Sequence, residues 1–359
     1  MSRPHRQGPY MIREATQKVD AGCDLTRAEA RAVMEELLSG GTPDPEIIAF
    51  LSALRDKGEK PAELVGFAEV MRRRAAELLA EAGAPLNGLA AGGPLLDTCG
   101  TGGHGHRTFN VSTAVALVAA AAGVRVAKHG NRSISSRSGS ADVLEALGVV
   151  IDLPLARIRE CLEKVGMVFL FAPHLHLAMK HVMSARRSLK TKTVFNLLGP
   201  LTNPLGATVQ LLGVYDRART EMMALALAEV GTRRALVVAA EDGIDEISTA
   251  GATQVSETDG KTVVTRHVQP EDFGLERAPA EALQGGDPNT NAGILRGVLD
   301  GEMGPRRDLV LANASAALVA AGRAADFLQG VAIAAEVIDS GAPRQTLAAL
   351  AEFTRKYRR

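Results

Sequence analysis

The chain is poor in cysteine, has no excess of charge of either sign, and lacks long apolar runs. Its 359 residues include 41 basic and 41 acidic side chains, so the formal net charge is zero. Nucleic-acid binding through a global basic field requires a surplus of Lys and Arg, and this balance argues against it. A local cationic pocket is still compatible with the composition. We therefore expect no nucleic-acid partner.

The three cysteines, Cys23, Cys99 and Cys161, lie far apart and form no CxxC pair. This spacing is not that of a structural zinc site, and a sparse, odd number of cysteines is typical of a reducing compartment. Cys99 lies beside a glycine-rich loop. We interpret it as a small residue that packs at the end of a strand, in preference to a reactive thiol.

The longest apolar run, from Ala114 to Val124, is too short to cross a bilayer. Residues 1–10 contain no apolar segment of the kind that secretory signals carry. We therefore expect a soluble, cytoplasmic protein that does not bind membranes.

The segment from residue 1 to about residue 92 is predicted to form a small helical domain. Thr26 and Glu29 have the spacing of a capping box, and Pro45 and Pro61 stand where prolines begin helices. Apolar residues recur at helical spacing after each of these starts. Three consecutive arginines, 72–74, are interpreted as a solvent-exposed face of one helix.

The segment 93–359 is predicted to be a larger α/β domain with a central, mostly parallel sheet. Short β-branched runs alternate there with helical segments, which is the pattern of that fold class. A helical insertion is expected near residues 173–190, packing on the N-terminal helical domain. The fold class is therefore α/β, with a small N-terminal helical domain beside the large one.

Three small, polar loops in this domain predict a site for a highly phosphorylated ligand. The first, Gly100–Gly103, is neither a dinucleotide fingerprint nor a Walker loop. The second, Asn110–Thr113, follows it at a helix start, where anions bind. In the third, Lys128–Ser133, cations and hydroxyls gather around Gly130 after a predicted parallel strand. Glycines let the backbone approach such a ligand closely.

Other segments carry less specific signals. Asp245 and Glu246 follow a predicted core strand, where they either face water or form a Mg²⁺ site with ligand phosphates. The segment 195–204, FNLLGPLTNP, is interpreted as a packed, rigid turn that could also wall a pocket for a flat ligand. Arg186 and Arg187 are either exposed helix charges or, in a pocket, a clamp for a carboxylate.

Together these segments resemble the anthranilate phosphoribosyltransferase family. The resemblance covers nearly the whole chain, from DLTRAEARAVMEELLSG through KHGNRSISSRSGSADVLEALG, FNLLGPLTNP and EDGIDEIS to NASAALVAAG. It implies transfer of the phosphoribosyl group of 5-phosphoribosyl 1-pyrophosphate (PRPP) to anthranilate in tryptophan biosynthesis. It also implies a helical domain plus an α/β domain, a fold shared with pyrimidine nucleoside phosphorylases, and a homodimer.

The resemblance implies roles for individual residues and Mg²⁺ as the cofactor. The residues that would bind PRPP are Gly100, Thr101, Gly102, Gly103, Thr108, Asn110, Ser112, Thr113, Lys128 and Ser140. Those that would bind anthranilate or form its channel are Gly100, His129, Asn131, Arg186, Gly199 and Pro200. Those that would hold Mg²⁺ are Ser112, Asp245 and Glu246. No catalytic acid or base is expected, because positioning and charge stabilisation of the leaving group are sufficient.

One position departs from the family pattern. The family's glycine loop usually continues with an aspartate, and this chain has His104 there. The exchange replaces an acid by a side chain that is neutral or cationic. It is either a tolerated loop variation or a sign of altered metal dependence or a changed acceptor.

Three alternative functions stay open. A paralogous phosphoribosyltransferase with another aromatic acceptor is compatible with His104. A pyrimidine nucleoside phosphorylase shares the fold, but KHGNRS, GPLTNP and Arg186 argue against it. A non-enzymatic, nucleic-acid-binding member of the fold is disfavoured by the balanced charge and by the pair Asp245 and Glu246.

Overall fold

The N-terminal part of the chain forms a layer of helices. The computed structural model describes residues 11–84, 92–102, 108–133 and 137–358. The first four helices are α1 (Met11–Asp20), α2 (Arg27–Ser39), α3 (Asp44–Lys57) and α4 (Pro61–Glu81). The predicted capping box begins α2: the Glu29 amide donates to Thr26 Oγ1 at 3.2 Å, and the Thr26 amide donates to Glu29 Oε2 at 2.7 Å.

A seven-stranded sheet forms the centre of the larger part. Its strands are β1 (Leu95–Gly100), β2 (Arg125–Gly130), β3 (Met167–Phe171), β4 (Val209–Gly213), β5 (Arg234–Ala240), β6 (Thr253–Thr258) and β7 (Val263–Val268). The spatial order is β3-β2-β1-β4-β5-β6-β7, with the first five strands parallel and the last two antiparallel. The fold class predicted from the sequence is confirmed.

Successive side chains of the central strands enter two different cores, because the side chains of a strand point alternately to opposite faces of the sheet. Leu211 and Val238 pack in one core with α5 (Val111–Ala121) and α13 (Pro305–Ala320). Leu212 and Val237 pack in a second core, which also contains the N-terminal helices and α11 (Thr220–Glu229). The helical layer therefore shares its core with one face of the sheet.

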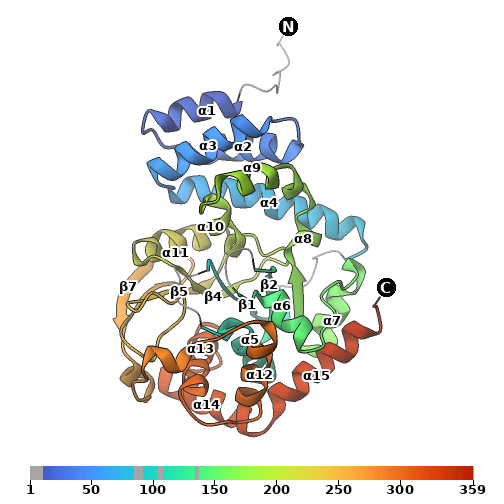
Figure 1. The fold of residues 1–359 in the computed structure, drawn as a ribbon, viewed down its shortest axis with the longest axis vertical. Coiled ribbons are helices and arrows are strands. Elements are labelled where there is room, and N and C mark those ends of the chain that lie inside the picture. The colour runs from blue at the N-terminus through green and yellow to red at the C-terminus, as the bar shows by residue number, and fades with distance from the viewer. Residues whose placement is uncertain (1–10, 85–91, 103–107, 134–136, 359) are drawn as a thin grey trace.

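The chain returns to the helical layer between β3 and β4. The segments there are α8 (Ala172–Leu175), a 3₁₀ helix η3 (Leu177–His181), α9 (Met183–Leu189) and α10 (Val194–Leu201). Helix α9 packs against α3, and η3 packs against α2. Figure 1 shows this return, with α9 lying beside the first helices. The domain boundary expected near residue 92 follows residues 85–91, which lie outside the described residues, and stays a prediction.

The interpretation of FNLLGPLTNP as a turn is wrong, because α10 includes most of it. Thr193 and Asn196 begin this helix as a capping pair, with the Thr193 amide donating to Asn196 Oδ1 at 3.0 Å. Pro200 lies in the last turn, where its lack of an N–H removes the bond to the carbonyl four residues earlier, and the helix ends one residue later at Leu201. The apolar side chains of the segment, buried in the second core, outweigh the turn preference of its prolines.

The interpretation of arginines 72–74 as one solvent-exposed face is also wrong for Arg72. Its Nε donates to the Leu201 carbonyl at 2.6 Å, and its Nη1 donates to the Val230 carbonyl at 2.7 Å. Arg73 and Arg74 pair with Glu35 at the surface of the helical layer. Arg72 thus fastens α4 to the ends of α10 and α11.

The remaining helices cover the other side of the sheet and the C-terminal part. They are α6 (Ser140–Ala146), α7 (Ile158–Val165), α12 (Pro288–Leu299), α14 (Phe327–Asp339) and α15 (Ala342–Arg355). Short 3₁₀ turns occur at Leu155–Arg157, Arg217–Arg219, Pro270–Phe273 and Ala280–Leu283. Within the described ranges, every helix is too short or too polar to traverse a lipid bilayer.

Candidate active site

The predicted phosphate loops meet at one edge of the sheet. Parallel strands β1, β2, β4 and β5 all end there, and the strand order reverses between β1 and its two neighbours. In open α/β sheets, ligands bind outside the carboxyl ends of the strands at such a reversal. The topology therefore explains why loops distant in sequence lie together.

The glycine loop after β1 packs against the loop that carries the two carboxylates. The Gly102 amide donates to Asp245 Oδ2 at 3.0 Å, and a Cβ on Gly100 would overlap with the same carboxylate. The Thr101 amide donates to the Gly213 carbonyl at 2.9 Å. Gly102 has φ +81°, a conformation that favours glycine. The close approach of these loops thus depends on small residues.

A buried lysine supports the start of helix α5. Lys128 Nζ donates to Ser112 Oγ at 3.1 Å and to the Thr98 carbonyl, and Thr98 Oγ1 donates to the Ser112 carbonyl at 2.8 Å. Only 1 % of Lys128 is exposed. Because an ammonium has three donors, one N–H of Lys128 is left for a ligand. This arrangement places positive charge directly at a helix N-terminus, where anions are favoured.

Asp97, in β1, supplies a negative charge near the positive charge of Lys128. The motifs in the sequence do not identify this residue. Asn203 Nδ2 donates to Asp97 Oδ2 at 2.8 Å, and the His129 amide donates to Asp97 Oδ1 at 3.1 Å. Burial raises the pKa of Asp97 to about 6, although the charge of Lys128 opposes the increase. The only feature of the sequence that points to Asp97 is its charge within an otherwise apolar run. Asp97 holds β2 and the segment after α10 together.

Asp245 and Glu246 form the second charged part of the site. Burial raises the pKa of Asp245, and burial together with the charge of Asp245 raises that of Glu246 well above its usual value. The charge of Lys128 and the Ser112 amide oppose the increase for Glu246. Two adjacent, half-buried carboxylates are costly to ionise together, and a divalent cation relieves that cost. These oxygen donors fit Mg²⁺, which takes one or two carboxylates plus phosphates and water.

Among the described residues, no group of three or more His, Cys, Asp or Glu side chains is close enough to bind a metal ion by itself. A cation at Asp245 and Glu246 would therefore depend on a hydroxyl, water and ligand oxygens for its other bonds. That requirement suits a metal that arrives with a phosphorylated substrate.

Asn110 and Ser140 lie at the starts of α5 and α6. Asn110 Oδ1 accepts from Asn291 Nδ2 at 2.9 Å and from Ser138 Oγ at 3.1 Å. Ser140 Oγ donates to the Asn131 carbonyl at 3.5 Å, and its position excludes a Cβ at Gly130. The loops that follow β1 and β2 are therefore joined through these polar side chains.

The other predicted phosphate-binding residues differ in position. Thr108 forms an isolated antiparallel bridge with Gln284, and the Thr113 hydroxyl is buried with no hydrogen-bond partner among the described residues. Gly103 and His104 lie outside the described residues. The structure thus brings most of this group to one edge and leaves the end of the glycine loop undescribed.

A separate, less polar region contains His129, Gly199 and Pro200. His129 Nδ1 lies 3.2 Å from the Gly199 carbonyl oxygen, and its ring meets the His176 ring edge to face at 5.2 Å. The Pro200 carbonyl accepts from Gln210 Nε2 at 2.7 Å. Burial lowers the pKa of His129 to about 3 and that of His176 to about 4. Both rings are therefore neutral at physiological pH.

Arg186 lies on α9, over the ring of Phe195, with its Cζ 4.9 Å from the ring centroid. In the described part of the chain it has no acidic partner, and its Nη1 contacts only the Met183 sulfur at 3.8 Å. Burial lowers the pKa of its guanidinium to about 10. Arg187, the next residue, is exposed. Arg186 is thus a charged, partly buried group available to an anionic ligand.

Asn131 is held by the residues that follow it. Its Oδ1 accepts from the Arg132 amide at 2.7 Å. The Arg132 guanidinium pairs with Asp142 at 3.1 Å and with Glu145. The Ser133 amide donates to Asp142 Oδ2 at 3.0 Å. Helix α6 therefore fixes the loop that carries Asn131.

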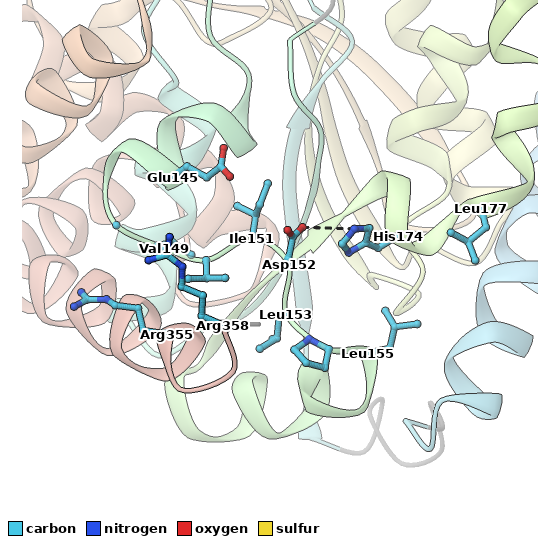
Figure 2. Close-up of a pocket in the computed structure, with 13 residues that line it drawn as sticks. Glu145, Val149, Ile151, Asp152, Leu153, Leu155, His174, Leu177, Arg355 and Arg358 are labelled. Atoms are coloured by element: carbon cyan, nitrogen blue, oxygen red, sulfur yellow. Dashed lines mark ion pairs between the residues drawn. The ribbon is translucent and has the colours of Figure 1, made fainter.

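A large cavity of about 1000 Å³ is lined by residues other than those of the phosphate loops. Figure 2 shows its lining, which includes Glu145, His174, Arg355 and Arg358, and an ion pair of 3.5 Å between His174 and Asp152. None of the predicted site residues within the described ranges lines it. We therefore assign it no part in the chemistry of the phosphate loops.

Comparison with known proteins identifies the family of the chain. Residues 92–344 match a family model described as the glycosyl transferase family a/b domain, and residues 13–75 match the helical bundle domain of the same family. Anthranilate phosphoribosyltransferase from Symbiobacterium thermophilum is 50 % identical over 342 residues, which cover 95 % of this chain and 97 % of the relative.

Two solved structures have the same fold. The crystal structure of anthranilate phosphoribosyltransferase from Thermus thermophilus has a TM-score of 0.85 and 43 % identity, covering 95 % of this chain and 99 % of that one. The enzyme from Saccharomyces cerevisiae, in complex with PRPP and Mg, has a TM-score of 0.85 and 27 % identity, covering 98 % and 100 %. The chain therefore belongs to the anthranilate phosphoribosyltransferase family, whose reaction transfers the phosphoribosyl group of PRPP to anthranilate in tryptophan biosynthesis.

Proposed function

We propose that this chain performs its family's reaction at the edge of the sheet described above, forming N-(5-phosphoribosyl)anthranilate and pyrophosphate. One observation carries the proposal: the Gly102 amide lies on Asp245, close to the start of α5 and to Lys128. Backbone amides, a cation and paired carboxylates are thereby concentrated in one small region. That combination suits a substrate with several phosphate groups.

The phosphates of PRPP are assigned to the loops at this edge. Gly100, Gly102 and Gly103 would admit the pyrophosphate close to the backbone, and Lys128 would donate its remaining N–H to a phosphate oxygen. The proposed set also includes Thr101, Thr108, Asn110, Ser112, Thr113 and Ser140. The assignment is supported by the hydrogen bonds that join these loops and by the position of Ser112 at a helix N-terminus.

Magnesium is proposed as the cofactor, held by Asp245, Glu246 and the Ser112 hydroxyl. Support comes from the raised pKa values of the two carboxylates and from the yeast relative, whose structure is described with PRPP and Mg. When bound, Mg²⁺ neutralises charge on the departing pyrophosphate. The residues of the chain would hold the phosphates.

The acceptor is assigned to the region between α9 and the end of β2. Arg186 would pair with the carboxylate of anthranilate, while Asn131, His129, Gly199, Pro200 and Gly100 would line its path. The Arg186 guanidinium, which has no acidic partner among the described residues, supports this assignment. It supplies a charge for the carboxylate, and Phe195 beneath it supplies a flat apolar neighbour for a ring.

No general base is needed for this chemistry. An aromatic amine is largely unprotonated at neutral pH, so its nitrogen is already a nucleophile. The difficult step is departure of pyrophosphate from C1 of the ribose, which the protein promotes by positioning and by stabilising the departing charge. Attack from the opposite face inverts C1. The neutral states of His129 and His176 agree with a role as walls of the site.

A homodimer and a cytoplasmic location are further proposals. The resemblance to the family supports the dimer, and the small, water-soluble substrates of the reaction support the location. Light scattering after size-exclusion chromatography tests the dimer directly: a mass near twice 37.7 kDa is expected, and a mass near 37.7 kDa contradicts it.

Product analysis tests the proposed function. The protein is incubated with PRPP, Mg²⁺ and anthranilate, and the products are identified by mass spectrometry. We expect N-(5-phosphoribosyl)anthranilate with anthranilate and much less product with anthranilamide, which lacks the carboxylate for Arg186. A parallel incubation with uridine and inorganic phosphate should leave uridine intact. Phosphorolysis of uridine without transfer to anthranilate would favour a nucleoside phosphorylase instead.

A further inference from the structure

We propose that Lys192 is an additional binding residue for the pyrophosphate of PRPP. The inference deepens the proposed function and rests on it. Lys192 lies in the connection between α9 and α10, far in sequence from the three phosphate loops. It is not part of the set that the family resemblance implies.

The position of Lys192 links this connection to the glycine loop. Its Nζ donates to the Gly102 carbonyl at 3.1 Å, while the Gly102 amide donates to Asp245 at 3.0 Å. Gly102 is therefore held between a cation and a proposed metal ligand. A phosphate group that binds to the amides of this loop would lie within the field of the Lys192 ammonium.

An aromatic ring supports the Lys192 ammonium. Nζ lies 3.3 Å from the centroid of the Tyr215 ring, a cation–π contact, and the Tyr215 amide donates to Thr101 Oγ1 at 3.2 Å. Tyr215 is thus joined to the glycine loop through its backbone. Arg219 lies over the same ring at 5.5 Å and pairs with Glu59 of the helical layer at 2.8 Å. The Tyr215 ring beneath Lys192 therefore has contacts to both the α/β part and the helical layer.

The charge of Lys192 is not neutralised by a direct ion pair in the described part of the chain. Asp245 and Asp216 attract it and Arg219 repels it, while burial lowers its pKa. Lys128 differs, because it is buried beneath the loops and two of its three donors are occupied. The two lysines thus approach the proposed pyrophosphate site from different segments, one fixed and one able to change partner.

A change of partner by Lys192 is favourable when PRPP binds. Its present acceptor is a neutral carbonyl oxygen. A phosphate oxygen is a stronger acceptor for an ammonium, since hydrogen bonds between two charged groups are roughly twice as strong as neutral ones. The side chain needs only to leave Gly102 and remain over Tyr215. Lys192 then adds positive charge where the leaving group accumulates negative charge.

Direct binding measurements test this inference. Titration calorimetry with PRPP and Mg²⁺, and separately with inorganic pyrophosphate and Mg²⁺, is performed on wild type, Lys192→Met, Lys192→Arg and Lys190→Met. Lys190 is a matched control on the same connection, exposed and two residues away. We expect Lys192→Met to lower the affinity for both ligands about tenfold or more, which corresponds to the loss of one charge-assisted hydrogen bond. Lys192→Arg should recover most of the affinity, and Lys190→Met should bind like wild type.

Kinetics and folding separate binding from a structural role. We expect the KM for PRPP to increase in Lys192→Met, with the KM for anthranilate and the melting temperature nearly unchanged. Equal affinities of wild type and Lys192→Met would overturn the inference while leaving the proposed function intact. A loss that Lys192→Arg does not reverse would also overturn it. Wild-type protein that binds neither ligand would instead overturn the proposed function, and the role of Lys192 with it.

Discussion

Arg186 is assigned to binding of the acceptor and not to binding of PRPP. Its guanidinium lies over Phe195 without an acidic partner in the described part of the chain, whereas the phosphate loops follow strands β1 and β2. A partly buried cation without a partner is unfavourable, and a ligand carboxylate removes that cost. The side chain is therefore suited to recognise the acid group of an aromatic amine.

Replacing Arg186 by Ala should weaken binding of anthranilate selectively. We expect the KM for anthranilate to rise at least tenfold, because a charge-assisted hydrogen bond contributes about 1.5–3 kcal/mol, while the KM for PRPP changes little. Steady-state kinetics with each substrate varied in turn measures both. Arg187→Ala, at the exposed neighbouring position, is the control. An equal increase for both substrates would contradict the assigned role.

His176, which packs against His129, predicts a pH dependence of stability. Folding depresses the pKa of His176 to about 4, whereas an unfolded histidine titrates near pH 6.5. Between these values the unfolded chain binds more protons, so this histidine's contribution to stability is complete above about pH 6.5 and is lost as the pH falls toward 4. The free energy of unfolding should therefore decrease on acidification.

Urea unfolding of wild type and His176→Phe at pH 7 and pH 5 measures this contribution. On acidification from pH 7 to pH 5, the free energy of unfolding of the wild type should fall by about 2 kcal/mol more than that of the variant. One histidine whose unfolded pKa is near 6.5 produces a difference of this size. Buried Asp97, with its pKa raised to about 6, acts in the opposite direction in both proteins and so cancels in the comparison. Identical losses would show that His176 is not kept neutral by folding.

At the scale of elements, the ends of the strands place the charged loops in contact. A Cβ on Gly213, at the end of β4, would overlap with the backbone carbonyl of Asp245, and one on Gly100, at the end of β1, would overlap with its carboxylate. Both strands therefore end in glycine at positions where the β5–β6 loop crosses them. The alternation of strands and helices predicted this edge, but not the residues that meet there.

Gly213→Ala should displace the loop that carries Asp245 and Glu246. Overpacking of this kind costs about 1–3 kcal/mol in stability, and the displaced carboxylates should require more Mg²⁺ for half-maximal activity. Thermal unfolding and a magnesium titration of the rate measure the two effects. Gly293→Ala in α12, where nothing lies within 4 Å of the added carbon, is the control and should be neutral or stabilising. A normal magnesium titration in Gly213→Ala would argue against the metal assignment.

Secondary structure was largely predictable because its causes are local. The capping box at Thr26, the helix after Ser112 and the strand β5 follow from spacing and burial patterns. Strands β3 and β6 were not predicted, and Pro200 misled the interpretation of α10. In β6, TQVSET, most of the buried residues are themselves polar and Val255 is the single apolar one, so the segment has no apolar pattern that would predict a strand. Tertiary contacts outweigh local preference in such segments.

The site was predictable in part for the same reason. Motifs identified the glycine loop, Lys128 and the carboxylate pair, because each is a short segment with characteristic chemistry. Asp97, His176 and Lys192 were not identified, since their roles depend on partners more than 40 residues away in sequence or on burial that no motif reveals. The roles of all these residues in binding stay predictions.

At the scale of the whole molecule, the helical layer and one face of the sheet share a core. Arg72 fastens them through two carbonyl groups, Leu201 at the end of α10 and Val230 after α11. Burial lowers the pKa of this guanidinium to about 10, with the charge of Asp97 opposing the decrease. This half-buried cation joins the two parts of the chain through its hydrogen bonds.

Arg72→Met should lower the free energy of unfolding by about 2–4 kcal/mol, because it removes the two hydrogen bonds to the Leu201 and Val230 carbonyls. Arg73→Met is the control: among the described residues, Arg73 makes surface ion pairs to Glu35 and Glu77, which contribute little. Chemical denaturation of both variants measures the difference. Equal stabilities would show that Arg72 does not fasten the helical layer.

The central claim is that one edge of the sheet binds PRPP with Mg²⁺ and delivers its phosphoribosyl group to anthranilate. The most direct measurement follows loss of anthranilate fluorescence and release of pyrophosphate together, in one mixture of protein, PRPP, Mg²⁺ and anthranilate. We predict equal rates for the two signals and loss of both when Mg²⁺ is chelated. Pyrophosphate release without loss of anthranilate fluorescence, or no reaction of either kind, would contradict the account.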